Sequence, residues 1–231
     1  MGDYFNQMAL DNLIIFGAGS YLGKKILEKI KATKIICISK SLKNINKKNV
    51  IIFKDYKKNE KKIEKLMNGK KNTAIFLNNH TKDNLIFNKS KRELTKELNL
   101  SVIETFENAK NISKIMMKEN FGTLIFFGST RGLSGDIGIA GYAITKNALS
   151  GLSKSFSREM ARFDITSNYL SLGYFKSPLF DKIDTKTKKK LIIKTDKKTL
   201  GDIDSIINSL YFLYKSRYVT GSIIKIDGGH T

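Results

Sequence analysis

The sequence predicts an α/β fold: a single doubly wound domain over residues 1–231, with a parallel sheet of about seven strands and helices on both faces. Three observations support this prediction. Short apolar runs alternate with longer stretches of helical periodicity, which favours right-handed strand–helix–strand units. A glycine-rich turn follows the first apolar run directly. The 231 residues, 41% of them hydrophobic, are enough for one domain with a substantial core.

The elements follow from this alternation. The expected strands are 12–16, 34–38, 50–53, 73–77, 123–127, 165–171 and 223–226. The expected helices are 21–31, 57–71, 99–118, 141–163 and 203–215. A lysine-rich segment without clear periodicity, 184–198, is expected to be a mobile loop, and residues 178–198 to form a lid over the substrate. In such folds the ligand lies beyond the carboxyl ends of the strands, where the strand order reverses.

The first strand runs into a turn typical of a Rossmann-type nucleotide site. Its glycines allow the backbone to approach a pyrophosphate, which then binds the free amides at the helix N-terminus. An ordinary glycine-rich strand–helix turn is the alternative interpretation. The cofactor contacts expected here are Gly17, Gly19, Ser20, Tyr21, Leu22 and Gly23.

The end of the second expected strand indicates which nicotinamide cofactor is used. An acidic residue at this point binds the ribose 2′-hydroxyl of NAD. This chain has Ser39, Lys40 and Ser41 there, and no carboxylate. A cation flanked by hydroxyls suits a 2′-phosphate, so Ser39 and Lys40 favour NADPH over NADH. In so lysine-rich a chain, Lys40 as part of the general background is the alternative.

Three residues form the expected catalytic set. Ser129 stands at the carboxyl end of the fifth strand, and a four-residue step on a helix places Tyr142 and Lys146 on one face. A cation about 4 Å from a phenol contributes up to ~4 kcal/mol at an effective dielectric near 20, while burial opposes that gain. Lys146 would thereby bring the pKa of Tyr142 from about 10 towards working pH, so that Tyr142 donates a proton to a developing alkoxide.

These motifs, in this order, resemble the short-chain dehydrogenase/reductase family over nearly the whole chain. The stretch 141–156 is most similar to 3-oxoacyl-[acyl-carrier-protein] reductases. The other motifs that carry the resemblance are Asn78-Asn79, Asn99-Leu100, Gly128-Ser129, Tyr218-Val219-Thr220-Gly221 and Asp227-Gly228-Gly229.

The resemblance implies a role for each matching residue. Ser129 would bind the substrate carbonyl, Tyr142 would be the catalytic acid, and Lys146 would also hold the nicotinamide ribose. Asn99 would hold a water that relays protons to Lys146. Asp55 would contact the adenine or only cap the next helix. Further cofactor contacts are expected from Asn78, Asn79, Tyr142, Lys146 and Gly173. Family members commonly form homodimers or homotetramers.

The sequence departs from the family pattern around the expected cofactor cleft. Phe16 replaces the leading threonine of the glycine loop, and Tyr21 replaces a glycine. His80 and Thr81 follow the asparagine pair, and Leu172 replaces a proline before Gly173. We expect His80 to be a loop side chain beside the cofactor rather than a catalytic base.

The leading functional hypothesis is NADPH-dependent reduction of a ketone, with a 3-oxoacyl group on a carrier protein as the first-ranked substrate. A reductase of a sugar or specialised-metabolite ketone is the alternative. A non-catalytic dinucleotide-binding protein on a degenerate scaffold is the alternative from another class.

Composition excludes several other classes. The net charge of +21 comes almost entirely from lysine, with only five arginines, which indicates a solvated surface rather than a nucleic-acid reader. Cys37 is the only cysteine and the two histidines are far apart, so neither a disulfide nor a metal site is expected. No membrane-spanning run or signal pattern is visible, and a cytoplasmic location is expected.

Overall fold

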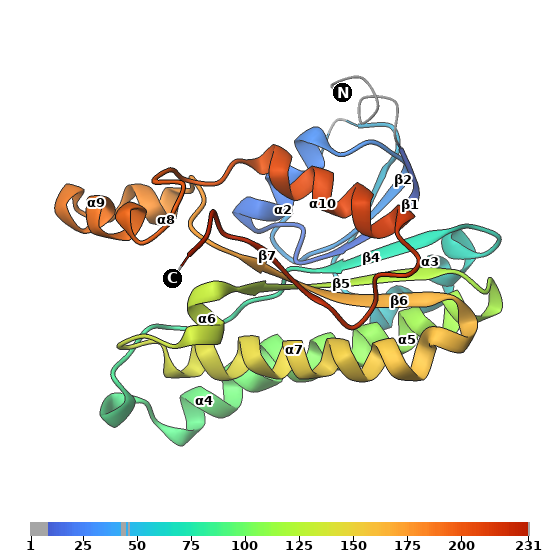
Figure 1. Ribbon diagram of the computed structural model, residues 1–231. Helices are drawn as coiled ribbons and strands as arrows, with labels where there is room; N and C mark the ends of the chain where they lie inside the picture. The colour runs from blue at the N-terminus through green and yellow to red at the C-terminus, as the bar shows by residue number, and fades with distance from the viewer. Residues whose placement is uncertain (1–8, 43–44, 46, 231) are drawn as a thin grey trace.

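The computed structural model describes residues 9–42, 45 and 47–230, and it confirms the predicted fold class. Seven parallel strands form one sheet in the order β3-β2-β1-β4-β5-β6-β7. The strands are β1 Leu10–Phe16, β2 Ala32–Ile38, β3 Val50–Phe53, β4 Asn72–Phe76, β5 Gly122–Ser129, β6 Ile165–Leu172 and β7 Ile223–Ile226. Figure 1 shows the sheet between two layers of helices.

The helices divide between the two faces of the sheet. Helices α2 (Tyr21–Lys29) and α10 (Ile203–Lys215) cover one face. Helices α3 (Glu60–Met67), α5 (Glu104–Lys118) and α7 (Ala140–Met160) cover the other. The short elements are η1 Lys57–Asn59, η2 Ile86–Asn88, α4 Lys91–Leu98, the π-helical turn η3 Asn99–Ile103, α6 Thr130–Ser134, η4 Ala161–Phe163, α8 Pro178–Asp181 and α9 Thr185–Ile193.

Alternation along each strand builds a separate core on each face. In β1, Leu13 and Ile15 pack under α2 and α10, whereas Ile14 and Phe16 pack with the side chains of α3, α5 and α7. On this second face Phe16 stacks on Phe76 with ring centroids 5.0 Å apart. Both faces of β1 are therefore buried, which is why its sequence reads as a continuous apolar run.

The strand order fixes where a ligand can bind. The chain runs outward from β1 through β2 to β3, then returns to place β4 on the other side of β1. The order reverses between β1 and β4, and the loops at their carboxyl ends diverge there. The glycine turn after β1 and the asparagine pair after β4 meet at this point.

The prediction that residues 184–198 form a loop was wrong. Most of it is helix α9, which projects with α8 beyond the end of the sheet (Figure 1). The Asp184 side chain accepts a hydrogen bond from the Thr187 amide at 2.9 Å and so caps the helix. Lysine is a good helix former, so a helix without an apolar stripe still forms.

Helix α4 was not predicted. Its N-terminus carries a complete capping box, in which Ser90 and Glu93 bond each other's backbone amides. Predicted helix 57–71 is realised as η1 followed by α3, and predicted helix 99–118 begins with the π-helical turn η3.

Candidate active site and cofactor cleft

A cavity of about 860 Å³ lies at the carboxyl ends of β1, β2 and β4, at the predicted switch point. It brings together eight of the predicted cofactor residues: Gly17, Gly19, Ser20, Ser39, Lys40, Asp55, Asn78 and Asn79. The sequence interpretation missed the opposite wall, which comes from η3 and α5 and includes Leu100, Ile103, Glu104, Glu107 and Asn108.

The glycines of the turn after β1 are required by close packing against neighbouring segments. Gly17 has a φ of +80°, and a Cβ atom there would lie 2.7 Å from Asn78 Oδ1. A Cβ atom on Gly23 would lie 2.6 Å from the Ala18 carbonyl oxygen, so Gly23 serves the packing of α2 on β1. Ser20 caps α2 by accepting from the Gly23 amide at 3.0 Å. Tyr21 is 42% exposed, and Tyr21, Leu22 and Gly23 lie outside the cavity lining.

The hydroxyl of Ser39 is committed to the loop itself. It accepts hydrogen bonds from the amides of Gly19, at 3.1 Å, and Ser41, at 3.3 Å. The exposed side chains of Lys40 and Ser41 line the cavity, and Lys54 and Lys57 also line it from the end of β3. Cations and hydroxyls therefore form this rim of the cavity.

Asp55 caps the turn after β3 in this structure, and its contact with the adenine stays a prediction. Its Oδ1 accepts from the Lys58 amide at 3.0 Å, so it caps the turn that follows β3. It also lines the cavity. His80 lines the same cavity through an exposed side chain, and its amide donates to the Ser101 hydroxyl at 3.0 Å.

The expected catalytic residues converge where β5 ends against α7. Ser129 is the last residue of β5, and Tyr142 and Lys146 lie one turn apart on α7. The Lys146 Nζ is 5.6 Å from the Tyr142 ring centroid and donates to the Phe127 carbonyl at 3.1 Å. Gly132 of α6 packs here, and a Cβ atom on it would lie 2.8 Å from the Lys146 Cβ.

Comparison with known proteins shows the family to which the chain belongs. A family model described as "Enoyl-(Acyl carrier protein) reductase" matches residues 52–231. The chain is 30% identical to the 3-oxoacyl-[acyl-carrier-protein] reductase FabG of Buchnera aphidicola subsp. Schizaphis graminum, over 94% of this chain and 95% of the relative. The chain belongs to the short-chain dehydrogenase/reductase family. It is therefore an NAD(P)-dependent oxidoreductase that acts on CH–OH and C=O groups.

Other relatives are similar to this chain in sequence, and two solved structures share its fold. The FabG of Rickettsia felis is 29% identical over 94% of this chain and 95% of its own length. Carbonyl reductase family member 4 of Xenopus laevis is 25% identical over 93% and 95%. The fold is shared with ElxO with NADP bound, which has a TM-score of 0.82 at 22% identity and covers 96% of this chain and 98% of that one. A short chain dehydrogenase from Leptospira borgpetersenii with bound NAD+ has the same TM-score at 19% identity and covers 98% and 94%.

Burial has the largest effect on the pKa of Tyr142. It raises the pKa of Tyr142 above its ordinary value, while the Ser129 hydroxyl and the charge of Arg131 act to lower it. The expectation that Lys146 would lower the pKa of Tyr142 is not met in this structure, because removal of the phenol from water outweighs the favourable interactions. Burial also lowers the pKa of the Lys146 ammonium to about 8.

Replacing the buried lysine by methionine is expected to stabilise the fold at neutral pH. The drop of the Lys146 pKa from 10.5 to about 8 corresponds to about 3 kcal/mol of destabilisation of the folded state. In Lys146→Met, loss of the hydrogen bond to the Phe127 carbonyl offsets part of the gain in stability.

The stability gained by this substitution should depend on pH. The pKa of Lys146 is lower in the folded than in the unfolded protein, so wild-type stability rises with pH from about 8 to 10.5 as the folded protein releases this proton first. The advantage of Lys146→Met should be about 1 kcal/mol at pH 7, by urea denaturation, and should disappear by about pH 10. Lys61→Met, an exposed position on α3, is the control; an advantage of Lys146→Met that is independent of pH would contradict the assignment.

Asn99 and Gly173 lie away from the cavity lining. Asn99 begins η3, where the Glu104 amide donates to its carbonyl, and its side chain is exposed. Among the described residues, no hydrogen bond joins the Asn99 side chain to Lys146, so the role of Asn99 as a water holder stays a prediction. Gly173 follows β6, and a Cβ atom on it would lie 2.6 Å from the Asp227 Cα.

A buried ion pair supports the helix that carries Tyr142. Glu97 of α4 accepts from Lys89 Nζ at 2.7 Å and from the Lys82 amide at 2.8 Å, and the two side chains of the pair are only 5% (Lys89) and 7% (Glu97) exposed. The other Glu97 oxygen lies against Gly141, where a Cβ atom would be 2.0 Å away. The segment between β4 and α5 is thereby locked to the first turn of α7, one residue before Tyr142.

The described part of the chain contains neither a helix that could span a membrane nor a cluster of side chains that could hold a metal ion. No helix in it is both long and apolar enough to cross a membrane. No group of three or more histidine, cysteine, aspartate or glutamate side chains in it could hold a metal ion.

Proposed function

We propose that this enzyme reduces a ketone to a secondary alcohol with NADPH, and that the ketone is a 3-oxoacyl group on an acyl carrier protein. The observation that supports this most directly is the convergence of Ser129, Tyr142 and Lys146 where β5 ends against α7, on the strand that neighbours β4. The names of the FabG relatives point to the same substrate. The net charge of +21 suits an acidic carrier protein.

The chain's own residues supply the polar half of the reaction. The cofactor, when bound, supplies the hydride that is transferred to the carbonyl carbon. The Ser129 hydroxyl donates a hydrogen bond to the carbonyl oxygen and orients it. As negative charge develops on that oxygen, Tyr142 donates its proton to it, and the charge on Lys146 stabilises the resulting phenolate. The raised pKa of Tyr142 keeps the phenol protonated and ready to donate.

The cofactor cleft fits a dinucleotide with a phosphorylated ribose. Gly17, Gly19 and Ser20 line the cavity beside the N-terminus of α2, where a pyrophosphate would bind, and Lys40, Ser41, Lys54 and Lys57 stand where the adenosine end would lie. We place residues 178–198, which carry α8 and α9, as the substrate lid, and we expect a cytoplasmic homodimer or homotetramer.

Reversing one charge is expected to change the cofactor preference. In Lys40→Asp the carboxylate repels a 2′-phosphate and accepts from a 2′-hydroxyl, so the ratio of kcat/KM for NADPH over NADH should fall about 100-fold. Steady-state kinetics with both cofactors measure this ratio. Lys61→Asp carries the same charge change on the exposed face of α3 and should leave the ratio unchanged. If both variants behave like the wild type, Lys40 does not contact the phosphate.

The proposed function is tested by following NADPH oxidation at 340 nm with acetoacetyl-N-acetylcysteamine and an acetoacetyl carrier protein. Turnover of both, with a lower KM for the carrier-protein form, is the expected result. Turnover of sugar ketones alone would favour the specialised-metabolite alternative. NADPH binding without turnover of any ketone would favour a non-catalytic dinucleotide-binding protein.

A further inference from the structure

One arginine lies beside the reacting residues without a role in the scheme above. Arg131 follows Ser129 by two positions, on the short helix α6. The next residue, Gly132, packs against Tyr142, because a Cβ atom there would lie 3.2 Å from Tyr142 Cε1. The Asn147 side chain donates to the Gly132 carbonyl at 2.9 Å and so fastens α6 to α7. The backbone of Arg131 is therefore fixed next to the proton donor.

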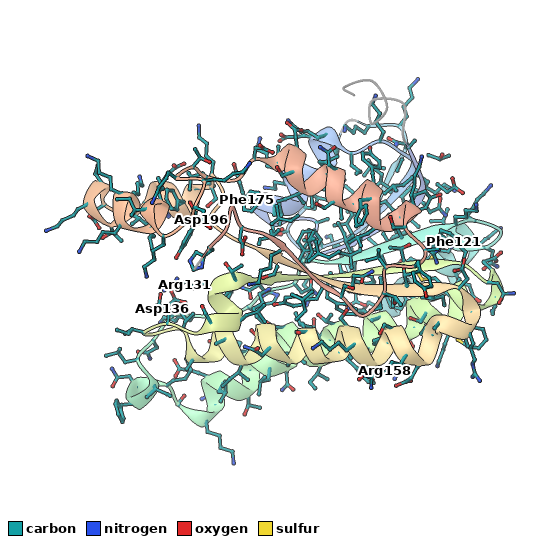
Figure 2. The ribbon with its side chains drawn as sticks, viewed as in Figure 1. Phe121, Arg131, Asp136, Arg158, Phe175 and Asp196 are labelled. Atoms are coloured by element: carbon teal, nitrogen blue, oxygen red, sulfur yellow. The ribbon has the colours of Figure 1, made fainter. Side chains whose placement is uncertain are left out.

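Only the Nε of the Arg131 guanidinium makes a hydrogen bond within the described part of the chain. Its Nε donates to Asp136 Oδ2 at 3.0 Å, and Asp136 in turn accepts from the Ile137 amide at 2.8 Å. No hydrogen bond from Nη1 or Nη2 reaches any residue that the structure describes. The Arg131 side chain is 38% exposed and Asp136 39%, so a small ligand can reach the guanidinium. Figure 2 shows both residues at the end of α6, on the side that faces the lid.

The charge of Arg131 reaches the reacting groups. It acts to lower the pKa of Tyr142, and it acts in the same direction on Tyr174, which follows β6. Asp136 partly balances it, and Lys194 from the lid end acts on Asp136. The guanidinium thus lies within electrostatic range of the proton donor while its two terminal nitrogens remain free to donate.

We propose that Arg131 binds an oxygen acceptor next to the reacting ketone, and so selects 1,3-dicarbonyl substrates over simple ketones. This inference rests on the proposed ketone reduction and names the group that the site recognises. A planar guanidinium with unused N–H groups suits a carbonyl or carboxylate oxygen. A 3-oxoacyl thioester and a free 3-oxo acid both carry that oxygen one methylene from the ketone, whereas a simple ketone leaves the guanidinium unpaired, which penalises its binding.

The test compares three ketones in the wild type, Arg131→Met and Arg131→Lys. Acetoacetyl-N-acetylcysteamine supplies a thioester oxygen, acetoacetate a carboxylate, and cyclohexanone neither. The preference for the thioester over cyclohexanone, as a ratio of kcat/KM, should fall about 10- to 100-fold in Arg131→Met and be partly restored in Arg131→Lys. A larger decrease in kcat/KM with acetoacetate than with the thioester would identify the carboxylate as the acceptor that Arg131 binds. Arg158→Met, exposed on α7 and labelled in Figure 2, is the matched control and should keep the wild-type ratio.

Calorimetric titration of the same compounds onto the NADPH complex separates this inference from the proposed function. Thioester binding that weakens in Arg131→Met supports the role of Arg131, whether or not the wild type shows turnover. Absence of turnover in the wild type would refute only the proposed ketone reduction. Equal loss for all three ketones, or no loss for any, overturns the role of Arg131 while ketone reduction stands. A wild type that neither binds nor reduces the thioester overturns both.

Discussion

Tyr142→Phe is expected to lower kcat about 1000-fold while leaving NADPH affinity nearly unchanged. The variant keeps the ring and its packing but removes the hydroxyl that we propose as the proton donor. The ring lies one turn from Lys146 and against Gly132, so its apolar atoms still fill the same space. The general acid accounts for a factor of about 10² to 10⁴ in such reactions, which sets the size of the effect.

Two measurements check this expectation: the rate of NADPH oxidation with a 3-oxoacyl thioester, and cofactor binding by fluorescence titration. Tyr218→Phe removes a hydroxyl from a fully exposed tyrosine and should behave like the wild type in both. If Tyr142→Phe kept wild-type turnover, Tyr142 would not be the proton donor. Loss of cofactor binding together with turnover would instead show that the substitution disrupts the site.

Glu97→Ala should cost about 3 to 5 kcal/mol of folding stability, the largest structural effect we expect from one substitution. It leaves the Lys89 ammonium buried without its carboxylate, and it removes the acceptor of the Lys82 amide. The effect should also reach activity, because the same carboxylate lies against Gly141 in the first turn of α7. Urea denaturation followed by circular dichroism measures the change in free energy of unfolding.

Two further variants separate burial from charge pairing. Glu64→Ala removes a surface partner of Lys118, at 2.7 Å, and should cost at most about 1 kcal/mol. The double variant Lys89→Met/Glu97→Leu replaces both buried charges by apolar groups and should recover much of the loss, since an uncompensated charge no longer remains. A Glu97→Ala protein as stable as Glu64→Ala would show that the pair is solvated in solution.

The sequence predicted most of the sheet and the glycine cleft because local patterns report them directly. A strand buried on both faces is a continuous apolar run, and the turn after β1 needs residues without a side chain at Gly17 and Gly23. The Ser129, Tyr142 and Lys146 set was predicted because its spacing follows strand ends and helix turns.

Other parts depend on contacts between distant segments, which no local pattern reveals. Glu97 and Gly141 meet only through tertiary packing, and a buried glutamate looks the same in sequence as an exposed one. Arg131 was noted only as one arginine among five, since its position beside Tyr142 depends on how α6 packs on α7. The direction of the Tyr142 pKa depends on how deeply the ring is buried, which spacing does not determine.

The placement of β1 between β2 and β4 also has a consequence for how the chain folds. The pairing with β2 joins Ile14 to Ile36, but the pairing with β4 joins Ile14 to Ala74, across a much longer stretch of chain. Closing the longer loop costs more entropy before any contact stabilises it, and proteins with many such non-local pairs fold slowly. The seam between β1 and β4 is also where Gly17 meets Asn78. The cofactor cleft therefore depends on this non-local pairing and is complete only when the seam between β1 and β4 has formed.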